Sequence, residues 1–142
     1  NGRYSAMVTA VGSGYSRWGN FAITRWREDA TSDDLGSYVF LRDVAGGEAW
    51  SAGFQPTGVE PREYSVAFNE DRVDFSRHDG PLITSMEVVV SSEDDAEVRL
   101  VGLDELDRGA VHGQVLALQY RPGSEWAGRI AAGGSTVRTT VR

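Results

Sequence analysis

Residues 82–103, LITSMEVVVSSEDDAEVRLVGL, decide the fold class of this chain. Two segments of the stretch alternate, wholly or in part, between apolar and polar side chains: Leu82–Ser91 and Glu97–Leu103. Between them lies Glu93-Asp94-Asp95, which is typical of a turn. Alternation with a period of two, in segments rich in β-branched residues, is the signature of a β-strand. The stretch therefore predicts two neighbouring strands joined by a turn.

The same alternation recurs upstream, in segments that are separated by turn signals rich in Gly, Pro, Asn or Asp. These segments are Tyr4–Val11, Phe21–Arg27, Ser37–Val44, Tyr64–Phe68 and Val73–Arg77. Between Val44 and Glu48, the pair Gly46-Gly47 favours a two-residue hairpin, because both glycines can adopt positive φ. No stretch shows a convincing apolar stripe at helical spacing. The pattern predicts an all-β fold of roughly nine or ten strands, as an antiparallel sandwich or a barrel.

The C-terminal part of the chain differs from the rest in charge and in aromatic content. Residues 1–100 hold 17 acidic and 9 basic side chains and 12 of the 14 aromatic ones. Residues 101–142 hold 4 acidic and 5 basic side chains. Two glycines interrupt the nearest helical candidate, 104–119, and short strands are expected at Val111–Tyr120 and Thr136–Val141. Such a shift indicates a change of structural role along the chain.

Length and composition bound the class of protein. A chain of 142 residues, 40% of them apolar and 25% charged, is expected to form one globular domain. Because it contains no cysteine, a disulfide framework, a thiolate metal site and a cysteine nucleophile are excluded. A net charge of −7 indicates that neither nucleic acid nor anionic lipid is a partner. Since the first residue is not Met, we expect a piece of a longer protein.

Two further features of composition bear on location and ligand. No segment approaches the ~18 apolar residues of a membrane span, and the first residues do not resemble a signal peptide. We therefore expect a cytoplasmic location without direct membrane contact; attachment of a larger parent enzyme to the inner membrane stays open. All 14 basic residues are Arg. Arg suits sugar hydroxyls and neighbouring carboxylates, although a GC-rich genome would produce the same bias.

The most unusual local run is Arg25-Trp26-Arg27-Glu28-Asp29. On a strand, the two arginines share one face and Trp26 points to the other. The functional interpretation is a platform for an anion or a sugar, with the two carboxylates orienting the guanidinium groups. The structural interpretation is a solvated strand end whose Trp belongs to the core. The sequence by itself favours the structural interpretation.

A second run, Gly12-Ser13-Gly14-Tyr15-Ser16-Arg17-Trp18, is predicted to be a Gly-rich loop. Its aromatic rings can stack on pyranose rings, while Ser16 and Arg17 can hydrogen-bond to hydroxyl groups. A phosphate-binding loop is disfavoured, because it needs a following helix and none is predicted. The structural alternative is a hairpin in which Trp18 covers the sheet.

The remaining polar clusters favour structural or solvent-exposed roles. Adjacent carboxylates occur at Asp33-Asp34, Glu70-Asp71 and Glu93-Asp94-Asp95, but neighbouring acids on a turn point apart, whereas a glycosidase needs two that flank one bond. His78 and His112 are the only histidines, and their spacing matches no metal motif. No G-x-S-x-G nucleophile motif is present. We predict no catalytic residue, no metal site and no cofactor in this chain.

Several of these runs are similar to a known family. Residues 1–58, which contain GSGYSRW, TRWRED, YVFLRD and WSAGFQP, closely resemble the N-terminal β-sandwich domain of glycoside hydrolase family 94, formerly glycosyltransferase family 36. Within that family, the likeness is greatest to the family-94 region of cyclic β-1,2-glucan synthases. Residues 71–101 resemble the continuation of the same domain.

The resemblance implies both a fold and a function. The fold is an antiparallel β-sandwich, part of a larger supersandwich. Family members are inverting phosphorylases of β-linked glucosides, or the phosphorylase-like part of cyclic glucan synthases. Their catalytic acid lies on a downstream (α/α)₆ barrel, and inorganic phosphate attacks the anomeric carbon. The resemblance therefore implies a non-catalytic domain that packs on a separate barrel, flanks the site for a β-glucan or its oligosaccharides, and contributes to dimer contacts, which allows a homodimer.

The resemblance also implies where sugar is contacted. The matching loops of the family face the substrate side, which gives Tyr15, Ser16, Arg17 and Trp18, together with the run Arg25, Trp26, Arg27, Glu28 and Asp29, as candidate substrate-binding residues. The alternative function is a free-standing carbohydrate-binding module that recognises β-glucan by aromatic stacking.

The chain departs from the family pattern in three ways. It lacks the barrel, it is at most about half of the sandwich, and the likeness fades after Val101. We therefore treat 1–142 as a single β-sandwich domain or fragment, with 1–101 resembling the family and 102–142 as divergent closing strands. Splitting a sandwich exposes sheet edges and an apolar face, so the tail or a second copy is expected to cover that face.

Overall fold

The computed structural model describes residues 2–24, 35–42 and 47–105, which form nine β-strands in three antiparallel sheets. The first sheet has the order β1-β2-β3 and the second pairs β4 with β5. The third has the order β6-β7-β8-β9. The bounds of the strands are β1 Tyr4–Val8, β2 Gly14–Trp18, β3 Phe21–Ala22, β4 Phe40–Arg42, β5 Ala49–Ser51, β6 Glu63–Phe68, β7 Arg72–Asp79, β8 Leu82–Val90 and β9 Glu97–Glu105.

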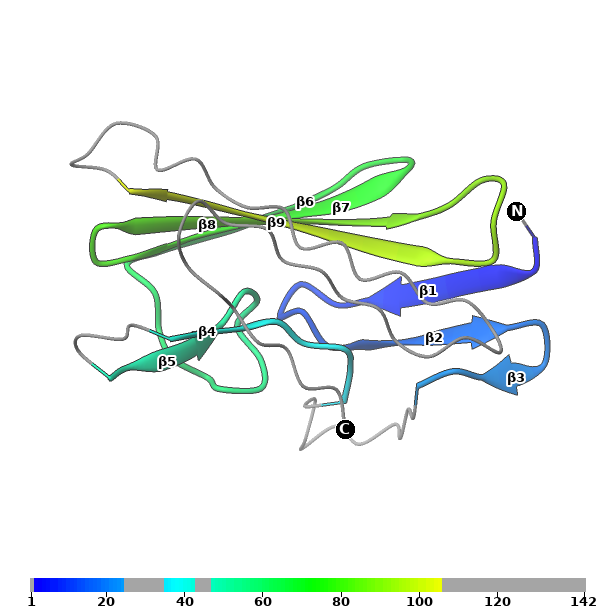
Figure 1. Ribbon diagram of the computed structural model, residues 1–142, viewed down its shortest axis with the longest axis horizontal. Helices are drawn as coiled ribbons and strands as arrows, with labels where there is room; N and C mark the ends of the chain where they lie inside the picture. The colour runs from blue at the N-terminus through cyan, green and yellow to red at the C-terminus, as the bar shows by residue number, and fades with distance from the viewer. Residues whose placement is uncertain (1, 25–34, 43–46, 106–142) are drawn as a thin grey trace.

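The three sheets form two layers. Figure 1 shows the four-stranded sheet β6–β9 as one layer, with the sheets β1–β3 and β4–β5 lying side by side in the other. The strands of the four-stranded sheet are connected in sequence order, each antiparallel to the next, so it is a meander of hairpins. This arrangement confirms the all-β antiparallel sandwich predicted from the sequence.

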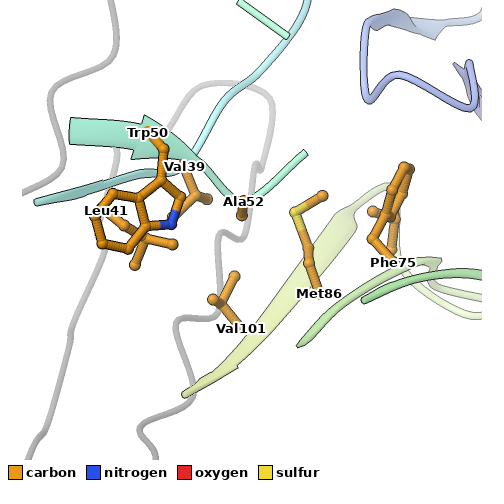
Figure 2. Close-up of a cluster of buried hydrophobic side chains, with 8 residues drawn as sticks. Val39, Leu41, Trp50, Ala52, Phe75, Met86 and Val101 are labelled. Carbon is orange, nitrogen blue, oxygen red and sulfur yellow. The ribbon is translucent and has the colours of Figure 1, made fainter. Parts of the chain in front are cut away.

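The core lies between the four-stranded sheet and the pair β4–β5. In Figure 2, Leu41 and Trp50 from that pair face Met86 and Val101 from β8 and β9. The full buried cluster is Val39, Leu41, Trp50, Ala52, Phe75, Met86, Val88 and Val101. Successive inward positions of β8 and β9 differ by two residues, which is the alternation that predicted these strands.

The Gly-rich segment 12–18 is a correction to the sequence prediction. Only its first residues turn; Gly14–Trp18 forms strand β2 rather than a loop and pairs with β1. Gly14 is required there because a Cβ at this position would lie 2.0 Å from the carbonyl oxygen of Met7. Gly14 therefore allows the close approach of β2 to β1. The segment forms a hairpin with β1, which is the structural alternative given for it above.

Within the described residues, two further predicted strands are shorter than expected. The strand predicted at Phe21–Arg27 is limited, among described residues, to Phe21–Ala22, and that predicted at Ser37–Val44 to Phe40–Arg42. The antiparallel partner of β4 is β5, in the register Leu41↔Trp50. Residues 43–46 lie outside the described residues, so the two-residue hairpin predicted at Gly46-Gly47 stays a prediction.

The predicted tail strands at Val111–Tyr120 and Thr136–Val141 lie outside the described residues, as does His112. None of the residues that the structure describes forms a helix of the length and apolarity that a membrane crossing requires.

Candidate functional site

Strand β2 carries four of the predicted site residues, distributed over its two faces. Ser16 and Trp18 point toward the four-stranded sheet, where Ser16 is buried and Trp18 is half-buried. Tyr15 and Arg17 lie on the opposite face by strand alternation. Tyr15 is half-buried, whereas Arg17 is exposed and donates from Nε to the carbonyl oxygen of Gly19 at 3.0 Å. The four residues predicted to form one sugar-facing cluster therefore lie on two faces of the strand, one toward the four-stranded sheet and one away from it.

Ser16 belongs to a buried polar chain that joins the two layers. Its hydroxyl donates to Glu97 Oε2, and Glu97 Oε1 accepts from Arg99 Nε at 2.6 Å. Arg99 Nη1 in turn donates to the carbonyl oxygen of Ser37. We name Ser16, Ser37, Glu97 and Arg99 the Glu97 bridge. Since Glu97 and Arg99 are 6% and 4% exposed, this carboxylate and guanidinium neutralise each other inside the protein.

Trp18 is held by the turn between β8 and β9. Its indole Nε1 donates to Asp95 Oδ2 at 2.8 Å, and its ring stacks on Phe21 with centroids 6.1 Å apart and planes 21° apart. The other carboxylate oxygen of Asp95 lies 3.2 Å from Arg3 Nε, an ion-pair distance without the alignment of a hydrogen bond. The orientation of the indole is therefore fixed from both sides, by a carboxylate and by an aromatic ring.

A second buried charge pair holds the segment that follows β5. Arg77 is fully buried and donates from Nε and Nη2 to both carboxylate oxygens of Asp79 at 2.6 Å. The same guanidinium donates to the carbonyl oxygens of Ser51, Gly53 and Val59 at 2.7–3.2 Å. We name this set the Arg77 clamp. Asp79 lies on β7 beside Arg77, whereas the three carbonyl oxygens belong to residues 51–59, so the clamp fastens that segment onto β7.

Tyr64 on β6 connects the four-stranded sheet to the β1–β2 turn. Its hydroxyl donates to the carbonyl oxygen of Ala10 at 2.8 Å, and its ring meets that of Phe54 edge to face. Burial raises the pKa of this phenol, against smaller lowering effects of the Phe54 backbone and the Arg77 charge. The 51–59 segment also reaches this turn, through hydrogen bonds from the amides of Phe54 and Gln55 to Val11.

The remaining predicted features fall into two groups. Arg25, Trp26, Arg27, Glu28 and Asp29 lie outside the described residues, as do Asp33 and Asp34. Among the described features, Glu93 and Asp94 are exposed on their turn. His78 Nδ1 lies 3.5 Å from a carboxylate oxygen of Glu63, an ion pair when the imidazole is protonated. Within the described ranges, no group of three or more His, Asp or Glu side chains is placed to hold a metal ion.

Sequence reasoning missed Glu97, Asp95 and Phe21 as neighbours of β2. Glu97 is 81 residues from Ser16, and Asp95 is 77 residues from Trp18. One signal was available: Glu97 and Arg99 occupy the inward positions of a predicted strand, where a charged pair is unusual unless it is matched. No local pattern identified Ser16 as their partner.

The arrangement is suited to rigidity more than to chemistry. Ser16, Trp18, Glu97 and Arg99 all make hydrogen bonds within the sandwich. Among the described carboxylates, Glu97, Asp95 and Asp79 are each adjacent to an arginine. The groups that remain accessible to a ligand around β2 are therefore exposed aromatic rings and guanidinium groups.

Comparison with known proteins agrees with this description. The family described as "Glycosyl hydrolase 94, supersandwich domain" matches residues 1–112. The chain is 40% identical over 101 residues to a "Cyclic beta-(1,2)-glucan synthase NdvB" of Rhizobium meliloti (strain 1021). That match covers 71% of this chain and 4% of the relative, so the chain spans a small part of that protein's length. The family match extends over most of the chain, and the chain belongs to the glycosyl hydrolase 94 supersandwich domain family.

Proposed function

We propose that this chain is a non-catalytic domain of a carbohydrate-active enzyme of the β-glucan phosphorylase or cyclic β-1,2-glucan synthase type. In this proposal it packs on a separate (α/α)₆ catalytic barrel and flanks the glucan site. Family membership and the similarity to a cyclic β-(1,2)-glucan synthase support the class of enzyme.

One observation supports the non-catalytic part most strongly. The polar groups of β2 are used to join the two layers of the sandwich, because Ser16 bonds to Glu97 and Trp18 bonds to Asp95. A nucleophile or a general acid must reach the reacting bond from an accessible position. Groups that hold a core together are not placed for that work.

Substrate contact is proposed for the groups of the candidate run that face outward, Arg17 and Tyr15, and for Arg25–Asp29. A homodimer and a cytoplasmic location complete the proposal; sedimentation velocity tests the first and cell fractionation the second.

The test of the proposal is association with a barrel. The full chain is mixed at about 20 µM, in the range typical of transient interfaces, with a family-94 (α/α)₆ barrel expressed as a separate polypeptide. The mass of the mixture is measured by light scattering after size exclusion. An unrelated (α/α)₆ barrel serves as the control. We expect the chain to form a complex with the family-94 barrel and none with the unrelated barrel. Separate elution of the chain from both barrels contradicts the packing proposal.

A further inference from the structure

Phe21 is the most exposed large hydrophobic side chain among the described residues, at 68%. It begins β3, directly after the turn formed by Gly19 and Asn20. Gly19 has φ +54°, the positive φ that the first central residue of a type II′ hairpin turn requires. Trp18 and Phe21 are paired across this turn, so both rings lie on the same face of the sheet. A tight hairpin thus presents the ring on a rigid support.

The ring of Phe21 is backed by a second ring whose position is fixed. Trp18 stacks nearly parallel to it, and the indole N–H is bonded to Asp95. Fixing both rings in advance lowers the entropy cost of stacking a ligand on them. An exposed aromatic ring held in this way is poorly explained by the stability of the sandwich, since the exposed ring buries little apolar area.

A charged group borders the aromatic pair. The Arg3 side chain is 66% exposed, and its Nε forms an ion pair with Asp95, the same carboxylate that accepts the Trp18 indole N–H. The amide of Gly19 donates to the carbonyl oxygen of Arg3 at 2.7 Å, which places Arg3 beside the hairpin. A guanidinium next to a flat apolar ring is the combination that a sugar needs, because a pyranose has an apolar face and a rim of hydroxyl groups.

The distribution of exposed apolar groups favours a small ligand over a protein partner. The other large ones among described residues are Phe40 on β4, Val59 in a loop and Phe68 on β6. These positions belong to other sheets or loops, so none of them is part of the hairpin that carries Phe21. A protein interface buries about 800 Å² on each partner, whereas a single sugar ring needs the area of one aromatic ring.

We propose that Phe21, backed by Trp18 and bordered by Arg3, is a stacking platform for one pyranose ring of a neutral β-linked oligosaccharide. This inference rests on the proposed glucan-flanking role and names a position for it. It adds to the contacts proposed at Arg17 and Tyr15 a ring on the other face of the same sheet, which the sequence motif did not include.

The test is calorimetric titration of the full chain with a β-1,2-linked glucopentaose. Phe21→Ala is expected to weaken binding at least about fivefold, and Phe21→Tyr, which keeps the ring, less than about twofold. Phe68→Ala is the matched control, because it removes an equally large ring that is 58% exposed on another sheet. Thermal unfolding of each variant verifies that the fold is retained. Equal affinities of the Phe21→Ala variant and the wild type overturn the platform, as does an absence of saturable binding by the wild type.

A second readout separates this proposal from the packing proposal. The Trp18 indole N–H resonance, assigned with Trp18→Phe, is expected to shift as the pentaose is added to the wild type and to stay unchanged in Phe21→Ala. Complex formation with the family-94 barrel is measured on the same variants. Sugar binding without a barrel complex supports the platform and contradicts the packing role. Loss of the barrel complex in Phe21→Ala, with sugar binding unchanged, makes the ring a protein contact and overturns the platform.

Discussion

At the scale of single residues, Glu97 is the group on which the joint between the two layers depends. Its two carboxylate oxygens accept from Ser16 and Arg99, one from each layer. A buried carboxylate that is paired in this way is costly to remove, because the partner guanidinium is left without its countercharge. Glu93 and Asp94, on the turn that precedes β9, are exposed.

The first prediction concerns this carboxylate. Glu97→Ala is expected to lower the free energy of unfolding by about 3–5 kcal/mol, because Arg99 stays buried with its charge unpaired. Glu93→Ala, an exposed acid a few residues away, is expected to change it by less than about 0.5 kcal/mol. Urea unfolding followed by tryptophan fluorescence measures both. Equal stability of the two variants would remove the bridge from the account.

The second prediction concerns the Arg77 clamp. Arg77→Lys is expected to lower the free energy of unfolding by about 3 kcal/mol or more, because an ammonium group cannot replace the planar fork that reaches Asp79 and three carbonyl oxygens. Arg72→Lys on the same strand is the matched control, and no change in the unfolding midpoint is expected for this exposed residue. A harmless Arg77→Lys would show that charge alone, without the fork geometry, holds residues 51–59.

At the scale of elements, the strands differ in how far the sequence determines them. The strands β6–β9 are predicted by the alternation of apolar and polar residues, because each strand turns one face to the core and the other away from it. Strand β2 is predicted as a loop because it lies in the Gly-rich run 12–18. Its glycine is there for close backbone contact with Met7, which only the paired structure reveals.

The candidate site was predictable only in part, because its side chains have partners that are distant in the sequence. The sequence motif located Trp18 and Ser16, but their partners Asp95 and Glu97 come from the far end of the described chain. Contacts of this kind depend on how one sheet packs on another, and no local pattern encodes that. Phe21 was assigned to a strand and not to the site, because exposure cannot be derived from alternation at a strand end.

The third prediction belongs to the contact between β6 and the β1–β2 turn. Because burial raises the folded-state pKa of Tyr64 above its unfolded value, the folded protein retains this proton longer than the unfolded chain. The stability that this difference contributes is present below about pH 10, the ordinary pKa of Tyr, and is lost as the pH rises toward the folded-state value. Stability should therefore decline with a steeper slope in the wild type than in Tyr64→Phe.

Melting temperatures measured from pH 8 to pH 11 test this prediction. Tyr15→Phe on β2 is the matched exchange at another half-buried tyrosine. Tyr64→Phe is also expected to be less stable at pH 8, by about 1 kcal/mol, because the hydrogen bond to Ala10 is lost. Parallel pH profiles of the wild type and Tyr64→Phe would show that the phenol does not titrate differently in the folded state.

At the scale of the whole molecule, the described residues form a sandwich with open edges. In the four-stranded sheet, β6 and β9 are the outer strands, and each has one described neighbour. The chain spans 4% of the glucan synthase that it matches, and family membership assigns it to a domain type, not to a complete enzyme. The buried charge pairs at Glu97 and Arg77 fasten its layers and segments together, which suits the positioning role proposed above.

The measurement that tests this account most directly is the release of glucose 1-phosphate. The full chain is incubated with a β-1,2-linked glucopentaose and inorganic phosphate, and the product is quantified by an enzyme-coupled assay beside a family-94 phosphorylase as the positive control. The account predicts no glucose 1-phosphate above the level without protein. Sustained, phosphate-dependent release by the chain alone, abolished when the protein is heated, would contradict it.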